Sequence, residues 1–398
     1  MWSYTNPTVE LFIMPLTLEA LQRDEALRQH EFPVTRKSIF LGHAGVCPLP
    51  RRVTEAMNSY LTACQDGGQE TALPARLESD TRALTAQLLN CTSEEIALVG
   101  PTSLGLSFVA GGLKFRRNDN IIIYHDDYPS NVYPWMALAD RVQVRFLNVR
   151  ELGRVRLIDV QGQVDDNTRL VVLASGHYLA GWRLNLDPLG KWLRARNILF
   201  CVDAIQTLGA FPTTVEHVDF LAADAHKWLL GPSHAGILYV RRDVQAKLAP
   251  IVHGWHNVRC PNFLTQDELV FKEDARRYEC GTNNFLGMVG LRESLRLIHE
   301  VGIETIGAEL ARRRQWLVPA LQALGYEVVC PITPPENTGA LISFHKPGVD
   351  LLALNLRLSE AGIAAAIRHL PGGQPVLRIA PHFYNTDVEM HRVLEVLA

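Results

Sequence analysis

A lysine stands in the middle of an otherwise apolar segment. Lys227 follows His226 within the segment 220–240 and precedes a Gly-Pro pair at 231–232. Burying an ammonium group is unfavourable unless a counter-ion pairs it or its charge is removed. An amine that forms a Schiff base with a carbonyl removes the charge covalently. The alternative is a surface lysine whose stem lies along apolar residues while its ammonium group stays in water.

Two carboxylates end apolar runs that are typical of strands. Asp203 ends the run 198–203, and Gln206 follows three residues later. Asp224 ends the next such run, two residues before His226. Ligands of α/β sheets bind where strands end, so these carboxylates are candidates for pairing with a cofactor cation. The simpler alternative is that Asp203 caps a turn.

Two other strand ends offer an anion site and an aromatic surface. Thr102 and Ser103 follow the run 95–99 and open a helical pattern rich in small residues. Hydroxyls and free backbone N–H groups therefore meet at a helix N-terminus, which favours an anion, although Ser103 alone is equally typical of an N-cap. Tyr128 follows the run 120–124. A tyrosine there either covers the edge of the core or lies flat on an aromatic ligand.

These four groups together match the needs of one cofactor. Pyridoxal phosphate requires a Schiff-base lysine, a cradle for its phosphate and an acidic partner that keeps its pyridine nitrogen protonated, so that the ring acts as an electron sink. Each signal is weak alone, but their order along the chain is specific. The sequence therefore predicts a pyridoxal phosphate site.

The elements that position these residues alternate between short apolar runs and helical patterns. The strand candidates are 38–41, 95–99, 120–124, 142–147, 169–175, 198–203, 218–224 and 235–240. Apolar strands separated by helices predict an α/β fold with a mostly parallel sheet that helices cover on both faces.

The pattern changes after Pro250. A loop-rich segment leads to a long helix and then to short strands and helices. This order predicts a second, smaller α+β domain. We expect the large cofactor-binding domain to span 31–268 and a discontinuous small domain to span 1–30 and 269–398.

Composition bounds the partners and the compartment. The chain has 398 residues, a formal net charge of −3 and no basic run, so we expect a small-molecule partner, with no nucleic acid and no membrane surface. Its seven scattered cysteines include no C-x-x-C pair, which predicts reduced thiols in a cytoplasmic protein without a metal site. The N-terminus lacks a basic region before its apolar run 11–16, which is unlike a signal peptide.

On these motifs the chain resembles the class V aminotransferases. This family of fold type I pyridoxal phosphate enzymes includes cysteine desulfurases, isopenicillin N epimerase-like proteins and kynureninase. The resemblance runs from "FLGHAGVCPLP" at 40–50 to "LRIAPHFYNTDVEMHRVLEVL" at 377–397, and its most specific part is "DAIQ" followed by the lysine of "AHKWLLGP". It implies a large domain with a seven-stranded type of sheet, and a homodimer.

The resemblance also implies roles for individual residues. The implied cofactor-binding set is Thr102, Ser103, Tyr128, Asp203, Gln206, Asp224, His226, Lys227 and Thr282. Lys227 would carry the cofactor and move the α-proton, Asp203 would pair with the pyridine nitrogen and Gln206 would reach the phenolic oxygen. Asp224 stands where desulfurases have a phosphate-binding serine, and its role is open because a carboxylate would repel phosphate.

The remaining candidates concern the substrate and the subunit interface. Thr282 matches a residue that reaches the phosphate of the neighbouring subunit, which implies a homodimer with shared active sites. Arg378 matches the arginine that binds the α-carboxylate of an amino-acid substrate. His177, Trp255 and His43 are further substrate-binding candidates, although a hydrogen-bonded structural histidine and a core tryptophan are the alternatives for the first two.

The predicted reaction is transamination or C–S lyase chemistry by β-elimination on an amino acid. Epimerisation and kynureninase-like hydrolysis use the same residues and stay open, as does a non-catalytic binding or regulatory protein of this fold. Desulfurases carry a nucleophilic cysteine on a loop before the carboxylate-binding arginine, and the segment 361–378 has none. We therefore expect that the chain is not a persulfide-forming cysteine desulfurase.

Overall fold

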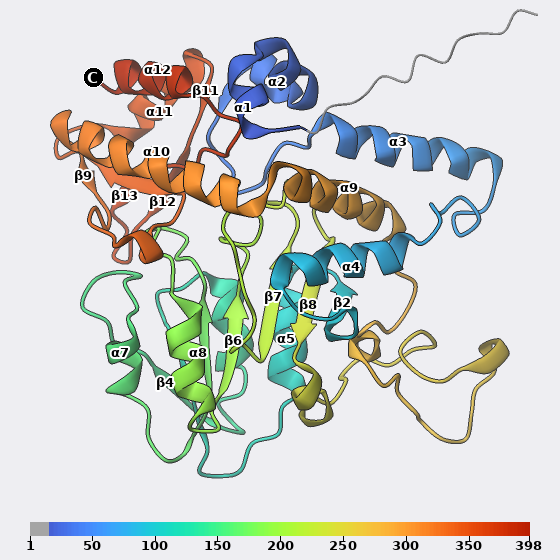
Figure 1. Ribbon diagram of the computed structural model, residues 1–398. Coiled ribbons are helices and arrows are strands. Elements are labelled where there is room, and N and C mark those ends of the chain that lie inside the picture. The colour runs from blue at the N-terminus through green and yellow to red at the C-terminus, as the bar shows by residue number, and fades with distance from the viewer. Residues whose placement is uncertain (1–15) are drawn as a thin grey trace, which may run out of the picture.

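The computed structural model describes residues 16–398 (Figure 1). Residues 1–15, which carry most of the N-terminal apolar run and half of the predicted segment 1–30, lie outside the described residues. Within 16–398, no helix combines the length and the hydropathy that crossing a bilayer requires.

A seven-stranded sheet forms the centre of the larger part of the molecule. Its strands are β2 (Ile96–Val99), β3 (Asn120–Ile123), β4 (Gln143–Phe146), β5 (Thr168–Ala174), β6 (Leu199–Asp203), β7 (Phe220–Asp224) and β8 (Gly236–Val240). They lie in the order β2-β8-β7-β6-β5-β3-β4. Strand β8 runs antiparallel to β2 and β7, and the other neighbours pair in parallel. The predicted α/β fold with a mostly parallel sheet is confirmed.

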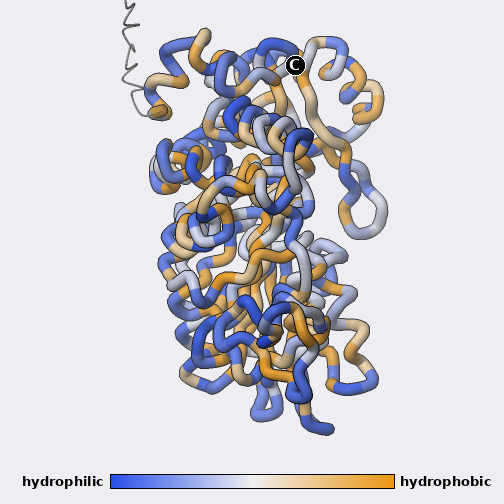
Figure 2. The backbone as a smooth tube through the Cα atoms, turned by 90° about the vertical axis from the view of Figure 1, so that its right-hand side faces the viewer, coloured by the Kyte–Doolittle hydropathy of each residue, from blue (hydrophilic) through white to orange (hydrophobic). Residues whose placement is uncertain are grey.

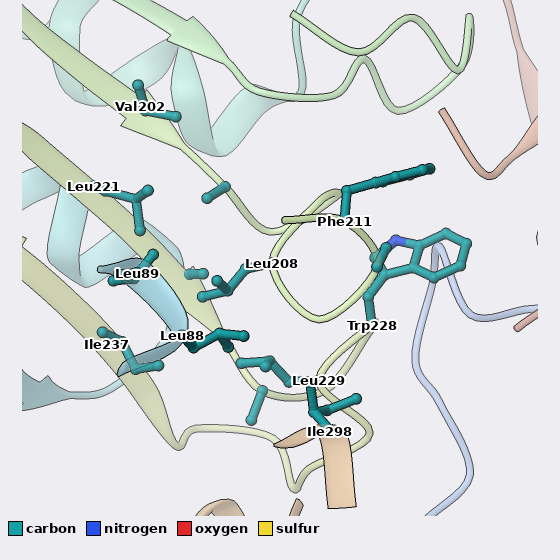
Figure 3. Close-up of a cluster of buried hydrophobic side chains, with 14 of the residues drawn as sticks. Leu88, Leu89, Val202, Leu208, Phe211, Leu221, Trp228, Leu229, Ile237 and Ile298 are labelled. Atoms are coloured by element: carbon teal, nitrogen blue, oxygen red, sulfur yellow. The ribbon is translucent and has the colours of Figure 1, made fainter. Parts of the chain in front are cut away.

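The central strands are buried on both faces because alternate side chains enter two different apolar layers. Val202 and Leu221 belong to one buried cluster, whereas their chain neighbours Cys201 and Phe220 belong to the other. Figure 3 shows Leu89 between Leu221 and Ile237 in the first layer. A continuous apolar strand pattern thus corresponds to a sheet with two covered faces.

Helices supply both layers. In chain order they are α1 (Leu18–Arg23), α2 (Glu25–Glu31), α3 (Arg51–Asp66), α4 (Leu77–Leu89), α5 (Thr102–Gly112), α6 (Tyr133–Met136), α7 (Leu157–Gln161), α8 (Leu186–Arg194), α9 (Phe285–Val301), α10 (Ile303–Ala323), α11 (Leu351–Glu360) and α12 (Asp387–Leu397). Helix α5 contacts β7 and β8, and α9 packs against α3 and α4. Figure 2 shows apolar residues concentrated inside the body of the molecule.

A second sheet lies in the upper part of Figure 1. Its strands, in the order β12-β13-β10-β9, are β9 (Glu327–Val328), β10 (Ile342–His345), β12 (Ala366–His369) and β13 (Pro375–Ile379), and all pair antiparallel. Helices α10, α11 and α12 pack beside it. The division of the chain into 31–268 and the remainder stays a prediction.

One predicted strand pairs outside the main sheet. Strand β1 (Ile39–Phe40) pairs in parallel with β11 (Ile363–Ala364). It is therefore paired with the C-terminal part of the chain and not with the main sheet. The chain then crosses to the larger part, where Cys47 N donates to His226 O at 2.8 Å. The segment 41–47 therefore connects the two sheets next to the carboxyl ends of the main strands.

Candidate active site

The carboxyl ends of the main strands open into a cavity of about 570 Å³. We call it the lysine cavity. Its lining includes eight of the predicted residues, namely Thr102, Ser103, Tyr128, Asp203, Gln206, His226, Lys227 and Arg378. Residues that the sequence did not single out also line it, among them Ser130, Tyr178 and Arg368. The volume lies within the range of small-molecule sites.

Lys227 is buried against this cavity. The residue comes three positions after the end of β7 and is 7% exposed. Its Nζ lies 5.3 Å from the centre of the Tyr128 ring. Within residues 16–398 Nζ has no hydrogen-bond acceptor. Burial lowers the pKa of Lys227 to about 8, against the opposing effect of Asp203. An amine with this pKa is partly neutral near pH 7, so it can act as a nucleophile and as a base.

Asp203 ends β6 and is 3% exposed. Its Oδ1 accepts a hydrogen bond from Ile205 N at 3.0 Å. Burial raises the pKa of Asp203 to about 7, and the neighbouring carboxylate of Asp127 contributes to the increase. A cation beside Asp203 would stabilise its ionised form.

Asp127 is a buried carboxylate that the sequence analysis missed. It accepts hydrogen bonds from Tyr128 N, Asn131 Nδ2 and Ala174 N. Burial raises its pKa to about 6. Through these contacts Asp127 attaches the start of the loop that contains Tyr128 to Ala174, the last residue of β5. Asp126 precedes it directly, and the sequence alone does not show which of the two aspartates is buried.

Gln206 lies between the cavity and the segment that connects the two sheets. Its Nε2 donates to Ala44 O at 3.1 Å, and its Oε1 accepts from Trp228 Nε1 at 2.9 Å. The amide nitrogen carries two hydrogens, so one remains for a ligand. The side chain is therefore held in place and still offers a donor.

Hydroxyls and an imidazole gather at the N-terminus of α5. Thr102 Oγ1 accepts from Asp224 N at 2.9 Å, which leaves its own hydrogen for another acceptor. Ser103 Oγ donates to Ser130 Oγ at 2.8 Å. The backbone N–H groups of Thr102 and Ser103 donate to no acceptor within the described chain. Together with His226 these groups suit an anion.

Two arginines on neighbouring strands also line the lysine cavity. Arg378 lies on β13 and Arg368 on β12, and in the register Arg378 is paired with Ala366. Arg378 Nη1 donates to Tyr178 O at 2.8 Å. Burial, together with the charge of Arg368, lowers the pKa of Arg378 to about 9. Neither guanidinium forms an ion pair with a carboxylate of residues 16–398.

Asp224 does not face the cavity. Its carboxylate accepts hydrogen bonds from the backbone N–H groups of Ala225, His234 and Ala235 and from Nδ1 of His226. Burial acts to raise the pKa of Asp224, but these hydrogen bonds, led by that from His226, hold it below the usual value. The carboxylate is therefore satisfied inside the protein.

The two predicted substrate histidines lie outside the lysine cavity. His177 Nδ1 accepts from Ala180 N at 3.0 Å, and its Nε2 donates to Asp126 O. His43 forms hydrogen bonds with Ala380 O at 2.8 Å and with the hydroxyl of Tyr384 at 2.7 Å. Burial lowers the pKa of both histidines to about 4, so both are neutral near pH 7. Both hold the backbone around the site.

Trp255 and Thr282 also lie elsewhere. Trp255 is 43% exposed and its ring contacts Phe263 on a surface loop. Thr282 lines a separate cavity of about 340 Å³, which we call the threonine cavity. Neither residue contributes to the lysine cavity of its own chain.

The lysine cavity fits pyridoxal phosphate by its donors and acceptors. It joins a buried amine without a hydrogen-bond partner, a carboxylate with a free oxygen, an aromatic ring and an anion-binding helix terminus. These are the groups that the aldehyde, the pyridine nitrogen, the ring face and the phosphate require.

The chain belongs to the class V aminotransferase family, whose model matches residues 39–392. It is 29% identical over 398 aligned positions to a probable cysteine desulfurase of Methanothermobacter thermautotrophicus, covering 94% of this chain and 97% of that relative. The structure resembles a cysteine desulfurase of Thermococcus onnurineus, with a TM-score of 0.84 and 24% identity over 93% of this chain and 96% of that one.

A solved structure with a TM-score of 0.82 and 22% identity is a form of C-DES with glycine covalently linked to its PLP cofactor; it covers 98% of that chain and 93% of this one. Another structure of that protein is described as a cystine C–S lyase in complex with its reaction product, cysteine persulfide. The predicted resemblance is confirmed, and the predicted cofactor is confirmed at the level of the family.

One prediction is wrong. The expectation that the chain is not a persulfide-forming cysteine desulfurase conflicts with the relatives, several of which carry the name cysteine desulfurase. The prediction rested on the missing cysteine in 361–378. The absence of a cysteine from one segment does not outweigh these relatives, two of which match over 94% and 92% of this chain.

Proposed function

We propose that this protein is a pyridoxal phosphate enzyme that cleaves the carbon–sulfur bond of cysteine or of a closely related sulfur-containing amino acid. The observation that carries the proposal is the buried amine of Lys227, which lies beside a carboxylate and faces two unpaired arginines across one cavity. The names of the relatives favour sulfur as the leaving atom.

The cofactor would be held at both of its ends. Thr102, Ser103 and His226 would bind its phosphate at the N-terminus of α5. Asp203 would pair with the pyridine nitrogen, and Tyr128 would cover the ring. When bound, the cofactor supplies an electron sink for the pair of electrons released at the substrate's α-carbon.

The substrate would be oriented by the small-domain edge of the cavity. Arg378 would bind the α-carboxylate, because a guanidinium fork matches the planar geometry of a carboxylate. Arg368 adds a second positive charge next to it, which suits a second anionic group such as the far carboxylate of cystine. Burial of Arg378 excludes water and strengthens this contact.

Lys227 would transfer the protons. Its amine removes the α-proton, the electrons of that C–H bond form the Cα–Cβ double bond or its equivalent, and sulfur leaves Cβ with the electrons of the C–S bond. The lowered pKa of Lys227 matches this task, because the neutral amine is present near pH 7.

We also propose that the enzyme is a homodimer in which Thr282 reaches the phosphate site of the partner. The support is its position: Thr282 lines the threonine cavity and not the lysine cavity of its own chain.

The test is to incubate the full-length protein, loaded with pyridoxal phosphate, with cysteine, cystine and sulfur-free amino acids. We expect sulfide from cysteine, or sulfane sulfur as cysteine persulfide from cystine, with pyruvate and ammonia formed from the rest of the amino acid. K227A should lose about 10²–10⁴-fold in rate. K346A is the matched control, because Lys346 is a part-buried lysine directly after β10 whose Nζ donates to Leu324 O.

Two outcomes would contradict the proposal. Keto acid formed from sulfur-free amino acids, with no sulfur released from cysteine or cystine, would identify a transaminase. Equal activity of K227A and wild type would remove Lys227 from the reaction.

A further inference from the structure

The carboxylate of Asp224 lies directly behind the imidazole of His226. Asp224 Oδ2 and His226 Nδ1 are 2.8 Å apart. Asp224 ends β7 and is 3% exposed, whereas His226 lines the lysine cavity. The pair therefore connects the buried end of a central strand with the anion site.

Each oxygen of this carboxylate accepts two hydrogen bonds. Oδ1 accepts from Ala225 N at 2.8 Å and from Ala235 N at 3.0 Å. Oδ2 accepts from His226 Nδ1 and from His234 N at 3.1 Å. Four donors saturate an ionised carboxylate. Asp224 has no acceptor site left for a solvent or ligand proton and does not face an anion in the cavity.

The arrangement determines the protonation of His226. An ionised carboxylate only accepts hydrogen bonds, so Nδ1 of His226 carries a hydrogen. Nε2 is then the atom available to the cavity, and it has no partner within residues 16–398.

The backbone of Asp224 organises a second group at the same end. Asp224 N donates to Thr102 Oγ1 at 2.9 Å, which directs the hydroxyl hydrogen of Thr102 to another acceptor. The hydrogen bonds of Asp224 involve no lysine or arginine that lines the lysine cavity. Arg368 and Arg378 come from the small sheet, on strands β12 and β13.

We propose that Asp224 is a positioning residue that holds the imidazole of His226 by Nδ1, so that Nε2 faces the phosphate group of the cofactor. The inference rests on the proposed cofactor site. Asp224 supports anion binding through the histidine and not by contact, which explains how a carboxylate occupies a position beside a phosphate site. The same carboxylate anchors the turn at His234, whose backbone φ is 64°.

The test compares two ligands that differ only in the phosphate. Equilibrium dialysis of the full-length chain against pyridoxal phosphate and against pyridoxal gives the affinity ratio that the phosphate contributes. In D224N we expect the affinity for pyridoxal phosphate to fall by about tenfold to a hundredfold, the range of a charge-assisted hydrogen bond, and the affinity for pyridoxal to change little. The ³¹P resonance of the bound cofactor should shift in D224N.

A double-mutant cycle separates this role from simple support of the fold. H226N should lose the same phosphate contribution, and D224N/H226N should be no weaker than H226N alone. D219N is the matched control, because Asp219 is a buried carboxylate at the other end of β7 that accepts from Phe200 N and pairs with Arg241. D219N should leave the affinity ratio unchanged.

Three results would overturn the inference. They are an unchanged affinity ratio in D224N, additive losses in the double mutant, and an equal change of the ratio in D219N. Failure of the wild-type chain to bind pyridoxal phosphate would instead refute the proposed function, so the two failures are distinguishable.

Discussion

The lysine cavity and the threonine cavity differ in the chemistry of their walls. The lysine cavity joins Lys227, two arginines and a carboxylate to a helix N-terminus. The threonine cavity is lined by apolar side chains such as Phe108 and Met288 and by polar ones that include Glu279, with Thr282 at its wall. The first has the groups that a reaction needs within one chain. The second contains the hydroxyl of Thr282, whose predicted ligand is the phosphate group in the partner's site.

From this difference we infer how the groups of the site are divided between the two chains of the proposed dimer. The proposed catalytic groups converge where β6 and β7 end and where the small sheet faces them, whereas Thr282 lines a cavity with Gly100 and His234, neither of which lines the lysine cavity. We therefore expect substitutions in the lysine cavity to affect the site of the same chain, and substitutions at Thr282 to affect the site of the partner chain.

After the loss of Lys227, the largest effect is expected from removing one of the proposed substrate-binding arginines. R378A should lower kcat/KM for cysteine or cystine by about a hundredfold, because a buried charge-assisted contact is lost. R368A should cost about tenfold, and more for cystine than for cysteine. Steady-state kinetics with both substrates check this. Unchanged kinetics in R378A would show that the carboxylate binds elsewhere.

Thr282 is tested by mixed dimers. We expect T282A homodimers to bind pyridoxal phosphate about tenfold more weakly, because one hydrogen bond to a charged group is lost. A mixed dimer of T282A with K227A should contain one intact site, since one subunit supplies Lys227 and the other Thr282. Its cofactor affinity should equal that of the wild type at half the capacity. Weak binding in the mixed dimer would place Thr282 within the site of its own chain, and unchanged binding in the T282A homodimer would place it outside both sites.

The pH dependence of cofactor loading tests the environment of Lys227. The neutral amine is the reactive form, and its fraction increases as pH rises through the pKa of about 8. The rate of loading should rise roughly 50-fold from pH 6 to pH 8 and then level off. R378A removes a charge that lowers this pKa, so its plateau should move to higher pH. Stopped-flow absorbance measures both, and a plateau near the ordinary lysine pKa would contradict the buried environment.

The smallest effect concerns stability without cofactor. The folded-state pKa of Asp203 is raised to about 7 from an ordinary value of 3.8, so the folded chain binds a proton more tightly than the unfolded chain. The stability from this proton is present below pH 3.8 and is lost as pH rises through about 7. D203N should therefore raise the melting temperature of the cofactor-free chain by a few degrees at pH 8 and leave it unchanged at pH 4. Equal melting temperatures at pH 8 would contradict this.

The strands and the first contacts of the site were predictable because they follow local patterns. The runs 198–203 and 218–224 correspond to β6 and β7, and Asp203 at the end of β6 and Lys227 just after β7 line one cavity. Strand β1 was found but misplaced, because its partner β11 is a two-residue strand with no pattern of its own.

What the sequence could not supply depends on pairing between distant segments. Arg368 enters the cavity because β12 pairs with β13, and a run of alanines before it gives no strand signal. The direction of the Asp224 carboxylate depends on the N–H groups of the turn at 234–235. Tertiary contacts of this kind leave no local trace in the chain.

The most direct test of the central claim is the covalent state of Lys227. The full-length protein incubated with pyridoxal phosphate should gain a visible absorption band, lose it on borohydride reduction, and yield a peptide with the reduced cofactor on Lys227 by mass spectrometry, while K346A behaves the same and K227A gains no such peptide. A protein that stays colourless, or a label on another lysine, would contradict the account.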